Sequence, residues 1–257
     1  MEKFASKAKT RYYGVRYGEM AAEITILLQD QVRYTLDGAA FLLGVPRSTV
    51  HGWANGYISK TRWGRPVPRK PILQTDRTDP TLINFYELIE LLYVKELTRP
   101  TTDKDGNPVP ALMQVSDVEV MSANLVSRLG AYPLASAELR RVCGQIVTEK
   151  IEPDLFTNPA LMQHLLAYAD ELVVDLEFRN NIVSVWYPVK DHSIRVDPAR
   201  RFGLPMVNSG HTAEAIYNRY LIEGKSPEDT AEWFEIDPAE VSQAVAFMEA
   251  WQSKPAA

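Results

Sequence analysis

The chain has 257 residues, of which 46% are hydrophobic, and a formal net charge of −5. It can bury a core, and its length fits one large domain or two to three small ones, of which we favour several small ones. The single cysteine, Cys143, excludes an internal disulfide and indicates a reducing compartment, which we take to be the cytoplasm. No stretch approaches the roughly 18 apolar residues that cross a bilayer, so we expect no membrane partner.

Charge is unevenly distributed along the chain. Residues 1–75 hold 12 Lys and Arg against 5 Asp and Glu, a net charge of +7, whereas the remainder carries −12. Binding to phosphates needs local rather than overall positive charge. The split is typical of a DNA-binding module joined to a body that contacts protein or dimerises, although a chance asymmetry would look the same.

Residues 11–30 begin with aromatics and arginines and continue as an apolar helical pattern, which we expect to pack beside the segment that follows. That segment, residues 34–56, reads YTLDGAAFLLGVPRSTVHGWANG and has the pattern of a helix-turn-helix. Thr35 is placed to cap a first helix and Gly44 to end it. The apolar residues of this helix share one face at spacings of four and three: Leu36, Ala40 and Leu43.

A second helix is expected from about Pro46, since proline is tolerated at a helix start. Val50 and Trp53 then face inward. The outer, N-terminal side of a recognition helix meets base edges in a major groove. The side chains predicted for that role here are Arg47, Ser48, Thr49 and His51.

The residues after Gly56 form a basic segment without Asp or Glu before Asp76. Its three prolines exclude a helix, and a winged helix-turn-helix carries its wing at this place. We expect phosphate contacts from Lys60, Arg62, Arg65, Arg69 and Lys70. Gly64-Arg65-Pro66 also matches the core of an AT-hook, so minor-groove insertion is an alternative, as is a solvated loop without a ligand.

The middle of the chain is predicted to combine helices with a small antiparallel sheet. Residues 80–98 read as an amphipathic helix with Glu87, Glu90 and Lys95 on its polar side. An exposed loop (99–110) and a second helix (115–129) are expected next. Strand-like alternation then occupies 141–151 and 176–189, the latter with Asn180-Asn181 as a hairpin turn, and a helix at 159–174 lies between them.

No enzyme signature is present in the sequence. Asp170, Glu171, Asp175 and Glu177 form the one dense acidic cluster, which we interpret as a solvated helix face rather than a metal site. The four histidines lack ligand spacing, and no Gly-rich phosphate loop or paired-cysteine motif occurs. We therefore predict a protein that is not an enzyme and that needs no metal or cofactor.

The C-terminal part is divided by three helix caps. Thr212, Ser226 and Asp237 each precede a predicted helix, and the three helices are expected to form a bundle. Spacing assigns its core to Ala215, Ile216, Tyr220, Ala231, Phe234, Val241, Val245 and Met248. The exposed side of the third helix carries Glu240, Gln243 and Glu249 without Lys or Arg, so phosphates would repel it. We assign this bundle to protein contact or dimerisation.

Two motifs in the run from Val196 to Val245 resemble a known domain. The Asp-Pro and Phe-Gly-x-Pro segment and the turn at 224–229 are similar to an antitoxin-like domain of bacterial toxin–antitoxin operons. Trp186-Tyr187-Pro188 is similar to its larger VapB-type members, which carry an N-terminal MerR-like helix-turn-helix. The resemblance implies an antitoxin that binds and neutralises a PIN-domain ribonuclease toxin and represses its own operon.

The sequence departs from that pattern at two places. Gly210-His211-Thr212 stands where the family usually has Gly-Thr-Arg, and Pro46 replaces the common Ser or Asn cap of the recognition helix.

We expect a mainly α (α+β) chain of three parts. These are a winged helix-turn-helix (1–78), a middle α+β and dimerisation region (79–190) and the C-terminal antitoxin-like helical domain (191–257). The functional hypothesis is a homodimeric antitoxin that binds operator DNA. Its alternatives are a helix-turn-helix transcription regulator without a toxin and a metal-dependent nuclease that uses the acidic cluster.

Overall fold

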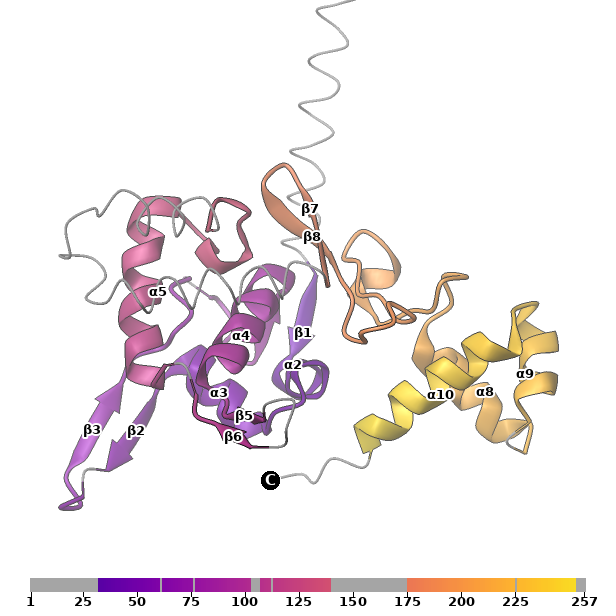
Figure 1. Cartoon of the computed structure of the whole chain (residues 1–257), viewed down its shortest axis with the longest axis horizontal. Coiled ribbons are helices and arrows are strands. Elements are labelled where there is room, and N and C mark those ends of the chain that lie inside the picture. Colours follow the sequence, from indigo (N-terminus) through magenta and orange to yellow (C-terminus); the bar gives the residue numbers. More distant parts are fainter. Residues whose placement is uncertain are drawn as a thin grey trace, which may run out of the picture.

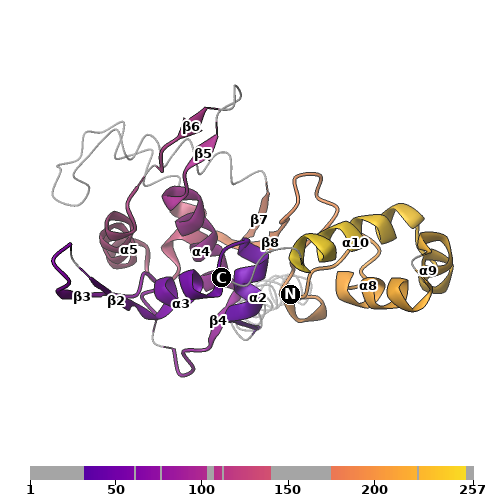
Figure 2. The same ribbon diagram turned by 90° about the horizontal axis from the view of Figure 1, so that it is seen from below.

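The computed structural model describes residues 32–60, 62–75, 77–102, 107–111, 113–139, 175–224 and 226–252. The expected helix within 11–30, the strand at 141–151 and the helix at 159–174 lie outside these ranges. Figures 1 and 2 show a larger N-terminal body and a set of C-terminal helices beside it, with the hairpin β2–β3 and helix α9 at opposite ends. Within the described residues, no helix is long and apolar enough to span a membrane.

The predicted helix-turn-helix is present in the N-terminal body. Helix α2 (Leu36–Leu43) is capped by the Thr35 side chain, which accepts from the Gly38 N–H, and ends at Gly44 with a φ of 65°. Helix α3 (Arg47–Asn55) follows after Pro46. Strand β1 (Arg33–Thr35) precedes α2 and pairs antiparallel with β4 (Leu82–Asn84), which brings the start of α2 beside the next long helix.

A two-stranded hairpin follows α3 directly. Strand β2 (Tyr57–Lys60) pairs antiparallel with β3 (Pro66–Arg69), with Tyr57 opposite Arg69 and Lys60 opposite Pro66. Two prolines are compatible with β3 because, among the described residues, this sheet has two strands and each of them is an edge strand. The extended basic segment expected from the sequence therefore exists as a hairpin.

Helix α4 (Phe85–Thr98) lies at the centre of the N-terminal body and is buried on nearly all sides. The prediction that Glu87 and Glu90 lie on the polar side of an amphipathic helix is wrong, since each is only 2% exposed. Glu87 closes a capping box with Asn84, the residue before the helix. The Glu90 carboxyl accepts from the Leu134 N–H at 3.3 Å. Hydrogen bonds within the protein thus replace water around both side chains.

The elements after α4 cover it. Short strands β5 (Thr101–Thr102) and β6 (Pro108–Val109) pair within the segment expected as a loop. Helix α5 (Val115–Leu129) has the predicted bounds, and the 3-10 helix η1 (Pro133–Ala135) packs against α4.

Further along, β7 (Leu176–Arg179) and β8 (Ile182–Trp186) form the predicted hairpin. Asn180 and Asn181 both have positive φ, as a tight hairpin turn requires.

An irregular segment with the 3-10 helix η2 (Arg201–Gly203) leads to three helices: α8 (Ala213–Ile222), α9 (Pro227–Phe234) and α10 (Pro238–Gln252). The Thr212 and Ser226 side chains cap the first two helices. The three helices share a hydrophobic cluster that includes Ile216, Ala231 and Val241. Ala215, expected in this core, is exposed, and Ala213 and Tyr217 are buried instead, so the buried face of α8 is rotated from the predicted one.

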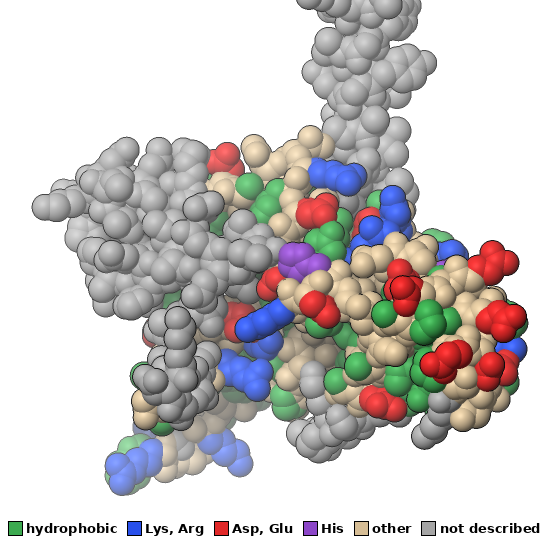
Figure 3. All heavy atoms as spheres, turned by 45° about the vertical axis from the view of Figure 1, so that its right-hand side comes forward, with side chains coloured by type: hydrophobic (Ala, Val, Ile, Leu, Met, Phe, Trp, Pro, Cys, Tyr) green, Lys and Arg blue, Asp and Glu red, His purple; other side chains and the backbone are tan. Residues whose placement is uncertain are grey.

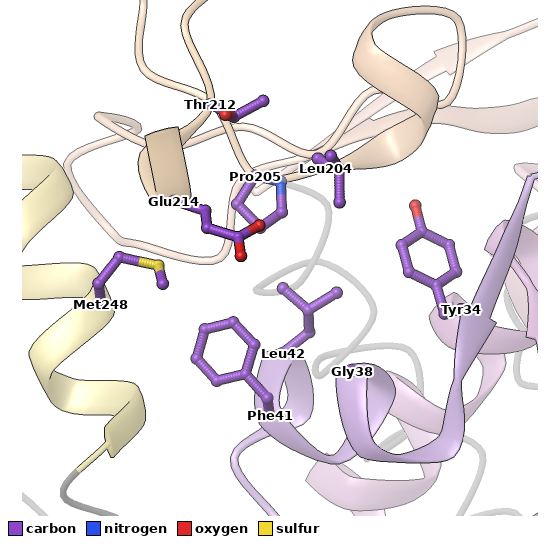
Figure 4. A pocket seen from close by; sticks show the side chains of 9 residues that line it. All are labelled: Tyr34, Gly38, Phe41, Leu42, Leu204, Pro205, Thr212, Glu214 and Met248. Carbon is purple, nitrogen blue, oxygen red and sulfur yellow. The ribbon is translucent and has the colours of Figure 1, made fainter. Parts of the chain in front are cut away.

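Contacts between described residues of the C-terminal part and the helix-turn-helix include one hydrogen bond and one ring pair. The Tyr34 hydroxyl donates to the Gly203 carbonyl at 3.1 Å, and its burial raises the pKa of this phenol. The rings of Phe41 on α2 and Phe247 on α10 meet edge to face, with centroids 5.3 Å apart. A small cavity of about 70 Å³ lies beside these contacts and is lined by Phe41 and Leu42 from α2, by Leu204 and Pro205, and by Met248 from α10 (Figure 4).

Candidate nucleic-acid interface

The outer side of α3 carries the residues predicted to read DNA. Arg47, Ser48 and His51 are exposed and Thr49 is half-buried, whereas Val50 and Trp53 are buried as expected. The amphipathic pattern of this short helix therefore fixes which side remains available to a ligand.

The residues in the first turn of α3 would not repel an anion such as a phosphate. Pro46 gives no side-chain cap, and no acidic residue lies in the first turn, so backbone N–H groups at this end lack a side-chain acceptor from the cap. Arg47 nevertheless has a partner, because its Nε lies 2.9 Å from Oδ1 of Asp37 in the first turn of α2. Both side chains are more than half exposed, and exposed ion pairs contribute only about 0–1 kcal/mol.

The hairpin β2–β3 adds positive charge next to α3. Lys60, Arg62, Arg65 and Lys70 are exposed and Arg69 is half-buried. In Figure 3, Lys and Arg side chains lie at the far end of this hairpin, at the lower left. All nine residues predicted from the sequence thus belong to two consecutive elements, α3 and the hairpin with its adjoining Lys70.

Close packing fixes the hairpin relative to α3. Gly56, with a φ of 75°, connects the two, and a Cβ there would lie 2.4 Å from the Arg69 carbonyl oxygen. The Tyr57 ring covers Gly52 on α3, and Ile72 donates its N–H to the Trp53 carbonyl at 2.8 Å. The hairpin and the helix therefore present one surface of defined geometry.

Arg77 supports the far end of α3 and was not identified from the sequence. Its guanidinium donates to the carbonyl of Ala54 and, at 2.9 Å, to the side chain of Asn55. The Nε of Arg77 also lies 3.7 Å from the buried Glu87 carboxylate, so the residue ties α3 to the start of α4. Its partners are more than 20 positions before it and 10 after it, so no local pattern indicates this role.

The acidic cluster is only partly within the described residues, since Asp170 and Glu171 lie outside them. Asp175 pairs with His192 at 3.0 Å, and Glu177 accepts from the Tyr187 hydroxyl at 2.5 Å. That hydrogen bond raises the pKa of Tyr187. Among the described residues, no three His, Cys, Asp or Glu side chains are grouped as metal ligands would be.

Known proteins resemble this chain in two ways. Residues 33–99 match a family model described as "Putative DNA-binding HTH domain". The crystal structure of Rv2018 from Mycobacterium tuberculosis has a similar fold, with a TM-score of 0.57 and 18% sequence identity over 82% of this chain and 96% of that chain. No curated protein matches the chain.

The N-terminal part is thus a helix-turn-helix domain of a DNA-binding type. The matched residues contain α2, α3, the hairpin and α4, which are the elements that form and support the exposed surface described above. The similarity to Rv2018 concerns the fold.

Proposed function

We propose that the protein is a sequence-specific DNA-binding regulator that places α3 in a major groove. The main support is the continuous surface that the exposed side of α3 forms with the basic hairpin. This surface lies in a domain that matches a model of a putative DNA-binding family. Base edges are read by Arg47, Ser48, Thr49 and His51, and phosphates are held by Lys60, Arg62, Arg65, Arg69 and Lys70.

Selection of bound fragments from a random DNA library, followed by gel shift on the enriched sequence, tests this proposal. We expect one preferred sequence and a strong decrease of affinity with salt, because several phosphate contacts release counterions. Binding that is indifferent to sequence at every salt concentration would contradict it.

The regulator acts as a homodimer in this proposal. A helix-turn-helix dimer binds two half-sites separated by about one helical turn, or about 34–36 Å, so the selected sequence is expected to be palindromic. Footprinting and the mass of the complex in solution measure both properties. A single protected half-site bound by one chain would overturn the dimer.

We further propose that the regulator is an antitoxin that acts in the cytoplasm, binds a PIN-domain toxin and represses its own operon. Support comes from the resemblance of Val196–Val245 to antitoxin-like domains and from the acidic surface of the C-terminal helices (Figure 3). Arg219 is the one Lys or Arg among the described residues of 213–252. Co-expression with the adjacent gene tests it: a stable complex and restored growth are expected.

A regulator without a toxin is the second candidate, because the same helices serve equally well to hold two copies together. It is favoured if the adjacent product neither binds nor inhibits growth.

The proposal assigns no catalytic step to the chain. Magnesium-dependent DNA or RNA cleavage that Asp175→Ala abolishes would contradict that assignment.

A further inference from the structure

A tryptophan occupies the tip of the basic hairpin. Trp63 follows β2 and is 83% exposed. The guanidinium carbon of Arg62 lies 5.9 Å from the centroid of the Trp63 ring. Tryptophan is highly buried on average in folded proteins, so this exposure is unusual. Because little of the indole is removed from water, it contributes little to the stability of the isolated chain.

The hairpin is attached to α3 through one of its two faces. Tyr57 and Arg69 lie opposite each other on the side that contacts α3, where Tyr57 covers Gly52. Ile58 lies on the other side of the pleat and is 73% exposed. The apolar side chains at the tip and on the outer face are therefore not part of the contact that attaches the hairpin.

The length of the hairpin is comparable with the spacing of DNA grooves. The four residues of β2 (Tyr57–Lys60) span roughly 13 Å at about 3.3 Å per residue, and the turn that holds Trp63 lies beyond them. A major groove and the neighbouring minor groove are separated by about half of a 34 Å helical turn, or about 17 Å. With α3 in a major groove, a strand of this length followed by the turn directs the tip toward the adjacent minor groove.

Charge decides which partner fits the tip. The residues around Trp63 include Lys60, Arg62 and Arg65, which favour a polyanion and disfavour a basic protein surface. Narrow minor grooves have a strongly negative potential that attracts arginine, and apolar side chains inserted there unstack base steps and kink the duplex.

We propose that Trp63 is a DNA-binding residue that enters the minor groove next to α3 and wedges its indole at a base step. The inference deepens the proposed function and rests on it. Arg62 and Arg65 flank the indole and hold it at the groove, and the deformable base step that accepts it adds specificity at a position that α3 does not contact.

The test compares the full chain with Trp63→Ala, Trp63→Phe and Arg65→Ala on the DNA sequence selected as described above. Trp63→Ala is expected to weaken binding about 5- to 150-fold, the range for loss of one aromatic–base stack. Its salt dependence stays unchanged, because no charge is lost, and Trp63→Phe recovers part of the affinity. Arg65→Ala instead lowers the slope of log affinity against log salt by about 0.9.

Unstacking is measured directly with 2-aminopurine placed at each minor-groove step of the same DNA. The wild-type protein is expected to raise the fluorescence at one step, and Trp63→Ala to abolish that rise. Because Trp63 is exposed, its variants are expected to unfold at the wild-type temperature, which thermal denaturation checks.

Each failure points to a different cause. If the wild-type chain selects no DNA, the proposed function is wrong. If it binds its DNA and Trp63→Ala binds equally well, or if affinity falls without any change at a base step, the wedge is wrong. Loss of binding to a protein partner with unchanged DNA binding would assign the indole to that partner and overturn the inference.

Discussion

In the proposed complex with DNA, base reading depends most on Arg47, and in the free chain the Arg47 side chain forms an ion pair with Asp37. Because the pair is exposed, it breaks at little cost when DNA approaches, yet the Asp37 carboxylate then remains beside the phosphates and repels them. Asp37→Asn is expected to raise the affinity for DNA several-fold while lowering the free energy of unfolding by about 0.3–1 kcal/mol, because it removes a favourable charge from the first turn of α2.

Gel shift and chemical denaturation measure both effects. Glu232→Gln on α9, also exposed, makes the same charge change in the C-terminal helices and serves as the matched control. Equal or weaker DNA binding by Asp37→Asn would mean that this carboxylate does not oppose the complex.

Glu90 affects stability through its proton. Burial raises its pKa to about 8 from an ordinary value of 4.5, with a smaller contribution of the same sign from Glu87 and an opposing one from the Leu134 N–H. Between these two pH values the unfolded chain ionises while the folded chain keeps its proton, so stability falls as pH rises. Glu90→Gln, which cannot ionise, is expected to add on the order of a few kcal/mol at pH 8 and little below pH 4.5. Urea denaturation across this range checks it, and parallel curves for both proteins would contradict it.

At the scale of elements, the connection between α3 and the hairpin at Gly56 controls the shape of the proposed DNA-binding surface. Gly56 and Gly64 both have a φ of 75°, but a Cβ at Gly56 meets the Arg69 carbonyl, whereas nothing lies within 4 Å of one at Gly64. Gly64→Ala is expected to cost only the backbone strain of about 1–2 kcal/mol. Gly56→Ala is expected to cost more and to weaken DNA binding, since the hairpin must move. Similar unfolding temperatures for the two variants would argue against a fixed joint.

Local sequence patterns predicted many of the caps and turns in this chain. They failed for residues whose partners are distant in the sequence. Thr35, Gly44 and the Asn180-Asn181 turn were predictable because each acts within a few residues of its own position. The burial of Glu87 and Glu90 could not be predicted, because polar residues at helical spacing normally indicate a face exposed to solvent. Both side chains have hydrogen-bond partners outside helix α4, at Thr75 and Leu134. Arg77 escaped prediction because its contacts on α3 are fixed by tertiary packing.

At the scale of the whole molecule, the ring pair of Phe41 and Phe247 lies where the helix-turn-helix meets the C-terminal helices. Phe247→Ala removes the ring contact with Phe41 and is expected to cost about 0.5–1.5 kcal/mol beyond the lost burial and to separate the unfolding of the two parts. Phe202→Ala is the control, because Phe202 is 85% exposed. Calorimetry should resolve two transitions for the first variant and one for the second. A single unchanged transition in both would show that the parts are coupled elsewhere.

The central claim is that α3 reads bases while the hairpin holds phosphates, and the salt dependence of DNA binding by Arg47→Ala and Arg65→Ala tests it most directly. Arg47→Ala is expected to lower the affinity for the selected sequence by about 1–3 kcal/mol and to leave binding to unrelated DNA nearly unchanged. Arg65→Ala is expected to weaken binding to all sequences and to flatten the salt slope by about 0.9. Equal, salt-insensitive losses for both variants on both kinds of DNA would contradict this division of roles.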